Sequence, residues 1–522
     1  MNPPQVICKA LAGTGKTFTL VEGAKRRMGI SSPGIIPSEQ QEKIWDIIGI
    51  GPKPSAMGFV AFNKTIKEEM ERRLDGVQGC EAMTMHSLGF QAIKAEAKRR
   101  GGYSRLSKWK TKDILVEHYG VNFKLMMKNK GQTVQSVDRM VQLSKYAAET
   151  CPDDDFLDTT SGHYGVEVNG ARDEIYDLTR HVLKESKDDL KNINFDDMIW
   201  LPVVNGLRTQ QFDLLMVDEG QDLNHCQQQL ALGAGQRICL VGDENQAIYG
   251  FAGADTESMT TMEAALAHHP QTREYQFGNN YEVLSLTITR RCSHAVVEEA
   301  KKIVPEFEAH KDNLEGYVGT IDFDSLWNKD SIGNEVIRPG DMMLCRTNAP
   351  LIRNAFAMIG RGIAAEIIGR DIKGSLLNLI KMLKPSSADD LVFKLINYEE
   401  REIRRIKKNP RHSETAILAI EDKCACLRIF CRYADSVEEV MLAIDSLFNE
   451  SGKPAVRLSS IHRAKGLEAR NVFIVHPELL PHPMARSEWE VGQERNLKYV
   501  AVTRAIENLY FVEEGDDNNH CS

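Results

Sequence analysis

The sequence predicts an α/β protein with two parallel-sheet cores, each carrying a helical insertion. Short apolar runs that end in polar loops are typical of buried parallel strands. Such runs lie at residues 5–9, 58–62, 212–217, 237–241, 342–345, 456–459, 472–475 and 509–512. Helical segments separate them, and this alternation is typical of doubly wound domains.

Two helix-rich, charged stretches break the alternation and predict the insertions. We therefore expect a first core at 1–92 and 191–284, with a basic insertion at 93–190. A second core is expected at 285–373 and 451–522, with a short insertion at 374–450. The segment from residue 29 to 54 is rich in Gly, Pro and Ser, which predicts a surface excursion.

The composition is that of a globular chain. Of 522 residues, 42% are apolar and 27% are charged, and this length predicts about three to four domains. No run of roughly 18 uninterrupted apolar residues is present, so we expect no membrane span. Signal-peptide features are lacking, and several cysteines lie in apolar runs, as reduced thiols do. We expect a cytoplasmic protein near the nucleoid, or a nuclear one in a eukaryote.

The charge is unevenly distributed along the chain. A net charge of −9 argues against a generally basic nucleic-acid coat. Between Lys94 and Lys145, however, there are thirteen Lys and Arg and only four Asp and Glu. Four aromatic residues are interleaved with them, namely Tyr103, Trp109, Tyr119 and Phe123. Phosphate-backbone binding and a solvated helical face both explain this pattern.

A phosphate-binding loop is predicted at residues 10–17, Ala-Leu-Ala-Gly-Thr-Gly-Lys-Thr, between a strand-like and a helical run. Small residues let backbone N–H groups curl around a polyphosphate at a helix N-terminus. Lys16 would reach the β- and γ-phosphates, and the Thr17 hydroxyl would bind Mg²⁺. The alternative is a Gly-rich turn that carries Lys-Thr by chance.

Acidic and amide side chains follow two later apolar runs. Asp218 ends the first run, where a carboxylate can hold Mg²⁺, and its neighbour Glu219 can deprotonate an attacking water. A solvated acidic turn is the alternative. Gln246 follows the next run and could contact the γ-phosphate. Tyr249 and Phe251 come directly after it and offer a base-stacking platform, although such aromatics also occur in cores.

The ordered motifs resemble those of the UvrD-like family of superfamily 1 helicases, subgroup 1A. In the first half the matching segments are the phosphate loop, Phe59-Val-Ala-Phe62-Asn63-Lys64, Thr84-Met-His86-Ser87, Phe195-Asp196-Asp197-Met-Ile, Asp218-Glu-Gly-Gln-Asp222 and Gly242-Asp-Glu-Asn-Gln246. In the second half they are Leu286-Thr-Ile-Thr-Arg290-Arg291, Ser459-Ser-Ile-His462-Arg-Ala-Lys465-Gly466-Leu-Glu468 and Tyr499-Val-Ala-Val-Thr503-Arg504-Ala505. Within the family the chain is most similar to the helicase core of F-box DNA helicases or to compact bacterial or phage relatives.

The resemblance implies two RecA-like cores, ATP and Mg²⁺ as cofactors, and a DNA track. The catalytic residues would be Lys16, Glu219, Gln246, Arg291 and Arg504. Nucleotide contacts would come from Ala12, Gly13, Thr14, Gly15, Lys16, Thr17, Thr19, Arg290 and Glu468, with Thr17 and Asp218 on the metal. DNA contacts would come from Phe62, Asn63, Lys64, His86, Tyr249, Phe251 and His462.

Two departures from the family pattern concern the base of the nucleotide. Family members usually carry a Gln-containing, adenine-reading segment upstream of the phosphate loop. Here a similar stretch, Pro37-Ser-Glu-Gln40-Gln41, lies downstream instead. It could fold back to take that role, but we expect a plain exposed helix start. Arg290 stands where the family usually stacks a Tyr on adenine, so selectivity for ATP is left open.

We therefore expect an ATP-dependent helicase that moves on single-stranded DNA, acts at single-strand/duplex junctions and is a monomer, with repair or replication proteins as partners. The 3′→5′ direction is implied by the subgroup resemblance. One alternative is a translocase that strips proteins from DNA with little unwinding. A P-loop kinase or GTPase is another, against which the arginine motifs of the second half argue.

Overall fold

The computed structural model consists of two compact units, residues 1–287 and 288–522. It describes residues 4–30, 32–61, 64–168, 170–248, 250, 253, 257–268, 281–328, 336–407, 414–448, 454–483, 485 and 488–513. Within these ranges, no helix is both long enough and apolar enough to cross a membrane.

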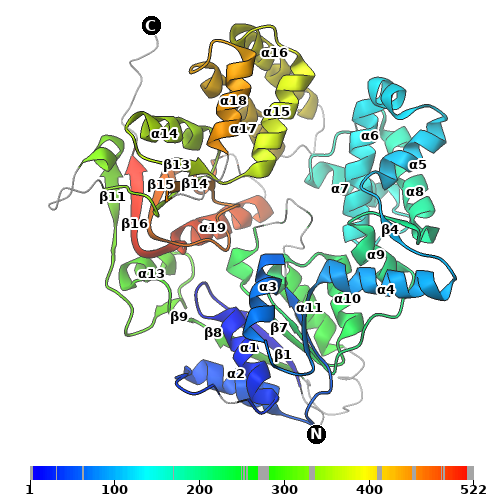
Figure 1. Cartoon of the computed structure of the whole chain (residues 1–522), viewed down its shortest axis with the longest axis vertical. Helices are drawn as coiled ribbons and strands as arrows, with labels where there is room; N and C mark the ends of the chain where they lie inside the picture. The colour runs from blue at the N-terminus through cyan, green and yellow to red at the C-terminus, as the bar shows by residue number, and fades with distance from the viewer. Residues whose placement is uncertain are drawn as a thin grey trace. The chain divides into compact units, whose positions relative to one another are not determined.

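The first unit is built on a six-stranded parallel sheet in the order β3-β2-β6-β7-β1-β8 (Figure 1). The strands are β1 (Gln5–Ala10), β2 (Met57–Ala61), β3 (Cys80–Thr84), β6 (Leu214–Val217), β7 (Ile238–Gly242) and β8 (Tyr281–Leu286). The four central strands are almost wholly buried. This explains why they are continuous apolar runs in the sequence.

Successive residues of these strands point to opposite faces of the sheet, and each face has its own helices. Val6, Cys8 and Phe59 pack with one set of helices, whereas Ile7 and Val60 pack with another. The first set is α1 (Lys16–Arg27), α2 (Glu39–Gly49) and α3 (Lys64–Arg73); the second is α4 (Met85–Arg99), α9 (Asp197–Val204), α10 (His225–Ala234) and α11 (Ser258–Ala267).

A helical subdomain extends from this unit between β4 (Arg105–Leu106) and β5 (Asn192–Ile193), which pair in parallel. Its helices are α5 (Lys110–Tyr119), α6 (Phe123–Tyr146), α7 (Asp154–His163) and α8 (Arg172–Asp188) (Figure 1). Buried residues of α5, α6 and α8 belong to the same apolar cluster as those of α4 and α9. The subdomain is therefore continuous with the core of the first unit.

The backbones of α4 and α9 approach each other closely at Gly89. A Cβ atom on Gly89 would lie 1.9 Å from the carbonyl oxygen of Met198. Because that obstacle is backbone, we expect Gly89→Ala to lower the free energy of unfolding by roughly 2–4 kcal/mol, although alanine ordinarily favours a helix. Urea unfolding should show this loss. Gly233→Ala in α10, where a new Cβ meets nothing within 4 Å, is the control and should be neutral or mildly stabilising. Equal effects in both variants would contradict the close contact.

The second unit contains another six-stranded parallel sheet, in the order β11-β16-β15-β12-β14-β13. Its strands are β11 (Tyr317–Asp322), β12 (Met342–Cys345), β13 (Ala365–Ile367), β14 (Val456–Ser460), β15 (Ala469–Val475) and β16 (Ala505–Glu513). Outside the sheet, β9 (Ile288–Thr289) pairs with β10 (Glu308–Ala309). The helices α13 (His294–Lys301), α14 (Ala349–Gly360) and α19 (Glu488–Val502) accompany the sheet.

Four helices form the insertion of the second unit, namely α15 (Arg370–Leu383), α16 (Ala388–Ile406), α17 (Glu414–Cys431) and α18 (Val437–Leu447). They pack on one another and share an apolar cluster with β12 and β14. The fold class is thus confirmed: two parallel-sheet cores each carry a helical insertion. The exact segment borders stay a prediction.

The expected surface excursion at residues 29–54 is wrong in one respect. This segment contains α2, which begins with a capping box formed by Ser38 and Gln41. Ile44, Trp45 and Ile48 of this helix are buried against α1. The abundance of Gly and Pro on either side of α2 concealed a core helix.

Candidate active site

The phosphate loop joins β1 to α1 at the carboxyl end of the sheet. Gly13 and Gly15 have φ angles of 68° and 85°, a left-handed region that favours glycine. The Thr14 hydroxyl donates to the Leu11 carbonyl at 2.8 Å, which holds the loop in a tight turn. The N–H of Thr19 donates to the Gly15 carbonyl at 2.8 Å. Free N–H groups at the start of α1 are suited to bind phosphate oxygens.

Two contacts bring the loop to the end of β6. The Thr17 hydroxyl donates to Asp218 Oδ2 at 2.6 Å. Lys16 Nζ lies 3.8 Å from Glu219 Oε1. An ammonium group, a hydroxyl and two carboxylates, far apart in the sequence, therefore meet at one edge of the sheet.

Glu219 is held in an unusual backbone conformation. Its φ angle is 53°, a region that non-glycine residues rarely adopt. Gln221 donates from Nε2 to Glu219 Oε2 at 2.5 Å and accepts at Oε1 from the N–H of Asp243 at 2.9 Å. Gln221 thus connects the acidic motif after β6 to the motif after β7. This positioning role was missed in the sequence, where Gln221 was only one letter of the acidic motif.

Gln246 belongs to the same group through Asp243. Its Nε2 donates to Asp243 Oδ2 at 2.6 Å, and Asp243 Oδ1 accepts from the N–H of Asn245 at 3.1 Å. Both Gln246 and Asp243 are buried. The predicted phosphate sensor is therefore held at the end of β7, the strand between β6 and β1.

The donor set at Thr17 and Asp218 fits a magnesium ion. Burial and the neighbouring Glu219 raise the pKa of Asp218 to about 6, because its charge is poorly solvated. A nearby cation would reverse this penalty. A hydroxyl and a carboxylate are hard oxygen ligands, and Mg²⁺ is commonly held by one or two such side chains together with substrate phosphates.

The Gln40-Gln41 stretch is not the plain exposed helix start that the sequence suggested. Gln41 is buried, and its Nε2 donates to Thr19 Oγ1 at 3.1 Å, next to the phosphate loop. Gln40 accepts from the N–H of Thr287 and donates to its hydroxyl, both at 3.0 Å. The start of α2 therefore contacts both α1 and the last residue of the first unit.

Comparisons with known proteins agree with this arrangement. Residues 3–267 match the model of the UvrD/REP helicase N-terminal domain, and residues 401–514 match that of the UvrD-like helicase C-terminal domain. The chain belongs to the UvrD-like helicase family.

Sequence identity with curated family members is low, but the matches extend over nearly the whole of this chain. F-box DNA helicase 1 of Gallus gallus is 24% identical over 95% of this chain, and the match covers 46% of that protein. F-box DNA helicase protein 1 of Schizosaccharomyces pombe is 23% identical, with 98% and 56% covered. ATP-dependent DNA helicase PcrA of Bacillus subtilis is 21% identical, with 97% and 80% covered. The chain thus spans about half the length of the F-box relatives.

The second unit of this family member holds the predicted arginines in two different environments. Arg291 is half-buried, and its Nε lies 2.6 Å from Glu468 Oε2. Arg504 is 1% exposed and donates to the carbonyls of Val500 and Leu467 at 3.0 and 3.1 Å. Arg290 is exposed. Arg291, predicted as a catalytic residue, and Glu468, predicted as a nucleotide contact, are thus paired with each other.

Of the predicted DNA contacts in the first unit, His86 and Lys64 can be placed. The His86 ring stacks on Phe195, with ring centroids 3.7 Å apart and an interplanar angle of 22°. Burial lowers the pKa of His86 to about 4, so its imidazole is neutral at pH 7. Lys64 begins α3, and its side chain is highly exposed. Phe62, Asn63, Tyr249 and Phe251 lie outside the described residues.

His462, the predicted DNA contact of the second unit, follows β14. Burial lowers its pKa to about 3, and the charges of Arg346 and Arg463 add to the shift. His86 and His462 are thus both uncharged at neutral pH. Any contact that they make with DNA is a hydrogen bond or a stack, without a counterion-releasing charge.

Phe195 is a surface aromatic that the sequence analysis did not assign. It is 61% exposed although it stacks on His86. Its position, just before Asp196 and Asp197 in a recognised motif, was the available signal. An exposed ring fixed by a second ring is a rigid platform for base stacking.

The basic stretch of the first insertion is partly neutralised within the protein. Lys110 and Lys145 are buried, and both contact Asp197. Lys130 pairs with Glu174 at 2.8 Å. The excess of Lys and Arg in the sequence therefore overstates the positive charge that this subdomain offers to a phosphate backbone.

Proposed function

We propose that this chain is an ATP-driven motor that moves on single-stranded DNA from 3′ to 5′ and separates duplexes. The observation that carries the proposal is the group at the edge of the first sheet, where Lys16 meets Glu219 and Thr17 meets Asp218. The same unit carries the Phe195–His86 stack. Two of the curated relatives, PcrA and Rep, are named ATP-dependent DNA helicases, which supports the same activity.

Each residue of this group has a role in the proposed hydrolysis. Lys16 neutralises the β- and γ-phosphates, while Thr17 and Asp218 hold Mg²⁺, which would offset negative charge on the phosphates. Glu219 orients the attacking water and accepts its proton. Gln221 fixes the Glu219 carboxylate through the 2.5 Å bond. Gln246 contacts the γ-phosphate and responds to its presence.

The remaining nucleotide contacts come from both halves of the chain. In the first unit, the loop residues Ala12, Gly13, Thr14 and Gly15 surround the phosphates with backbone N–H groups, and Thr19 lies on α1 behind them. In the second unit, Arg291 and Arg504 stabilise charge on the transferred phosphoryl group, as arginine fingers do. Arg290 stacks on the base and Glu468 binds the ribose.

The DNA track would run over the aromatic and histidine residues of the first unit. Phe62, Tyr249 and Phe251 stack on bases, joined by Phe195, while Asn63, Lys64, His86 and, from the second unit, His462 contact the strand. Stacking is sequence-tolerant because every base has a flat face. A monomer that binds single strands and single-strand/duplex junctions is sufficient for this mechanism.

Removal of the Phe195 ring should weaken binding to single-stranded DNA. We expect Phe195→Ala to reduce the affinity for oligo-dT about 5- to 150-fold, because one stacked base contributes about 1–3 kcal/mol. Fluorescence anisotropy with labelled oligo-dT measures this. Phe393→Ala removes a similarly exposed ring (66%) from α16 and should have no effect. Equal affinities of the two variants for oligo-dT would show that Phe195 does not stack on the bound DNA.

Strand displacement on partial duplexes tests direction and task together. We expect ATP-dependent displacement with a 3′ single-stranded tail and little with a 5′ tail. Displacement only from 5′ tails would overturn the direction. If single-stranded DNA stimulates hydrolysis but no duplex is opened, a parallel assay on filament-coated DNA decides whether the chain instead removes bound proteins.

A further inference from the structure

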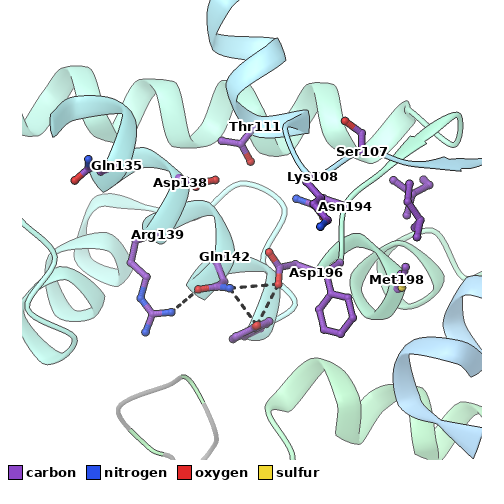
Figure 2. Close-up of a pocket in the computed structure, with 14 residues that line it drawn as sticks. Ser107, Lys108, Thr111, Gln135, Asp138, Arg139, Gln142, Asn194, Asp196 and Met198 are labelled. Atoms are coloured by element: carbon purple, nitrogen blue, oxygen red, sulfur yellow. Dashed lines mark hydrogen bonds between the residues drawn. The ribbon is translucent and has the colours of Figure 1, made fainter. Parts of the chain in front are cut away.

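A pocket of 610 Å³ opens where the helical insertion of the first unit meets α9. One wall is formed by α6, and another by the segment between β5 and α9 (Figure 2). Phe195, Asn194 and Asp196 come from that segment, and Arg139 and Gln142 from α6. The volume is large enough for one nucleobase with its sugar, and the lining combines a flat ring with polar groups.

A chain of hydrogen bonds fixes the polarity of this pocket. Arg139 donates to Gln142 Oε1, so the amide nitrogen of Gln142 must point the other way. That nitrogen donates to Tyr146 Oη at 3.2 Å and to Asp196 Oδ1 at 3.4 Å. The Tyr146 hydroxyl in turn donates to Asp196 Oδ1 at 3.1 Å. Two of these bonds, from Gln142 and Tyr146, thus end on the same oxygen of Asp196, Oδ1 (Figure 2).

The other carboxylate oxygen of Asp196 is directed away from this chain of bonds (Figure 2). Because the carboxylate lines the pocket, this oxygen can accept a bond from a ligand. Burial raises the pKa of Asp196 although Lys145 acts in the opposite direction. The ionised carboxylate is thus poorly solvated, and a donor from a ligand would stabilise it.

The pocket adjoins the residues proposed to contact DNA. Phe195 belongs to its lining and stacks on His86. A Cβ atom on Gly253 would lie 2.6 Å from Tyr146 Cδ2. The backbone at Gly253 therefore passes directly beside Tyr146 in the pocket wall. A strand that stacks on Phe195 would have the pocket within reach of its bases.

We propose that this pocket holds one base of the bound single strand and that it favours guanine. This inference rests on the proposed DNA-motor function. Guanine has two adjacent donors, N1–H and the N2 amino group, on its Watson–Crick edge, which a carboxylate can accept. Adenine, cytosine and thymine each place an acceptor beside their donor on that edge, and this acceptor would face the lone pairs of Asp196.

Competitive binding of single-base variants of one oligonucleotide tests the preference. The probes are a dT oligonucleotide and the same strand with one central dG, dA, dC or deoxyinosine, measured by fluorescence anisotropy. We expect the dG strand to bind about tenfold more tightly than dT, as base-specific contacts do. Deoxyinosine, which lacks the N2 amino group, should be intermediate. Equal binding of the dG and dT strands by the unmodified protein would overturn the proposal.

Asp196→Asn is the matching protein variant. It can keep an acceptor at Oδ1 for Tyr146 and Gln142 while it replaces the pocket-facing oxygen with a donor. We expect it to lose the dG preference and to retain its affinity for dT. Asp177→Asn in α8, a highly exposed acid on the same insertion, makes the same charge change and should keep the preference. A preference that persists in Asp196→Asn would contradict the role of the carboxylate.

The two levels of the proposal fail differently. If no oligonucleotide binds and none stimulates ATP hydrolysis, the motor function itself is wrong. If dT binds and stimulates hydrolysis but dG gives no gain, only the base pocket is wrong.

Discussion

Lys16→Ala is expected to abolish ATP hydrolysis and to weaken nucleotide binding strongly. The ammonium group of Lys16 stands at the start of α1, 3.8 Å from Glu219 Oε1, and its positive charge is needed for the phosphates. We expect the turnover rate to fall by at least about 10³-fold, a typical loss for a group that stabilises transferred charge. A coupled assay of ADP release measures turnover, and fluorescent-nucleotide titration measures binding.

Glu219→Gln separates proton transfer from nucleotide binding at the same site. The amide keeps the size of the side chain but cannot accept a proton, so turnover should fall by about 10²- to 10⁴-fold while nucleotide affinity stays within about twofold. Asp46→Asn, on α2 and outside the group, controls for the loss of one acid. If Glu219→Gln loses binding as completely as Lys16→Ala, the assignment of Glu219 as the base is wrong.

Asp197→Ala is expected to cause the largest loss of stability. Lys145 Nζ and Lys110 Nζ lie 2.7 and 2.8 Å from the two oxygens of Asp197, and all three side chains are buried. Burial alone would raise the pKa of Asp197, but Lys145 and Lys110 outweigh burial and lower it. Without this carboxylate, Lys145 loses its ion pair and Lys110 keeps only the more distant Asp189, at 4.0 Å, at a cost of about 3–5 kcal/mol.

Urea unfolding of the full chain measures this loss, with Lys145→Met as the comparison. Methionine fills much of the space of lysine, and the remaining pair of Lys110 and Asp197 is electrically balanced. Lys145→Met should therefore cost clearly less than Asp197→Ala. A loss below about 1 kcal/mol in Asp197→Ala would show that the cluster is solvated in solution.

The same cluster ties the segment that carries Phe195 to the helical insertion. Asp197 follows Phe195 by two residues and begins α9, and its two lysines come from α5 and α6. The helical insertion thus clamps the segment that presents Phe195. This arrangement could not be predicted from the sequence, where Lys110 and Lys145 were simply two of thirteen basic residues.

The strands that were predicted from the sequence and those that were missed occupy different positions in the sheets. The central strands of both sheets, such as β6 and β12, were predicted because neighbours on both sides leave them wholly buried. Within the two six-stranded sheets, the four strands that were not predicted, β3, β8, β11 and β13, are the edge strands. Their side chains are largely half-buried or exposed, so they lack the continuous apolar run that identifies a central strand.

Prediction of the active site from the sequence was limited in a similar way. Motif order allowed us to name Lys16, Thr17, Asp218 and Glu219, and the structure brings them within contact of one another. Their catalytic roles stay predictions. The role of Gln221 was not identified, and Gln41 was expected at an exposed helix start, because their positions depend on backbone turns and helix packing that a linear pattern does not contain. The contacts of Gln40 with Thr287 connect residues 247 apart and were equally out of reach.

The most direct test of the proposed motor is the steady-state rate of ATP hydrolysis by the unmodified chain, with and without oligo-dT. We expect saturating single-stranded DNA to raise the rate at least about tenfold, because a motor couples turnover to movement along its track. The stimulation should disappear in Lys16→Ala. A hydrolysis rate that is the same with and without DNA would contradict the proposed function.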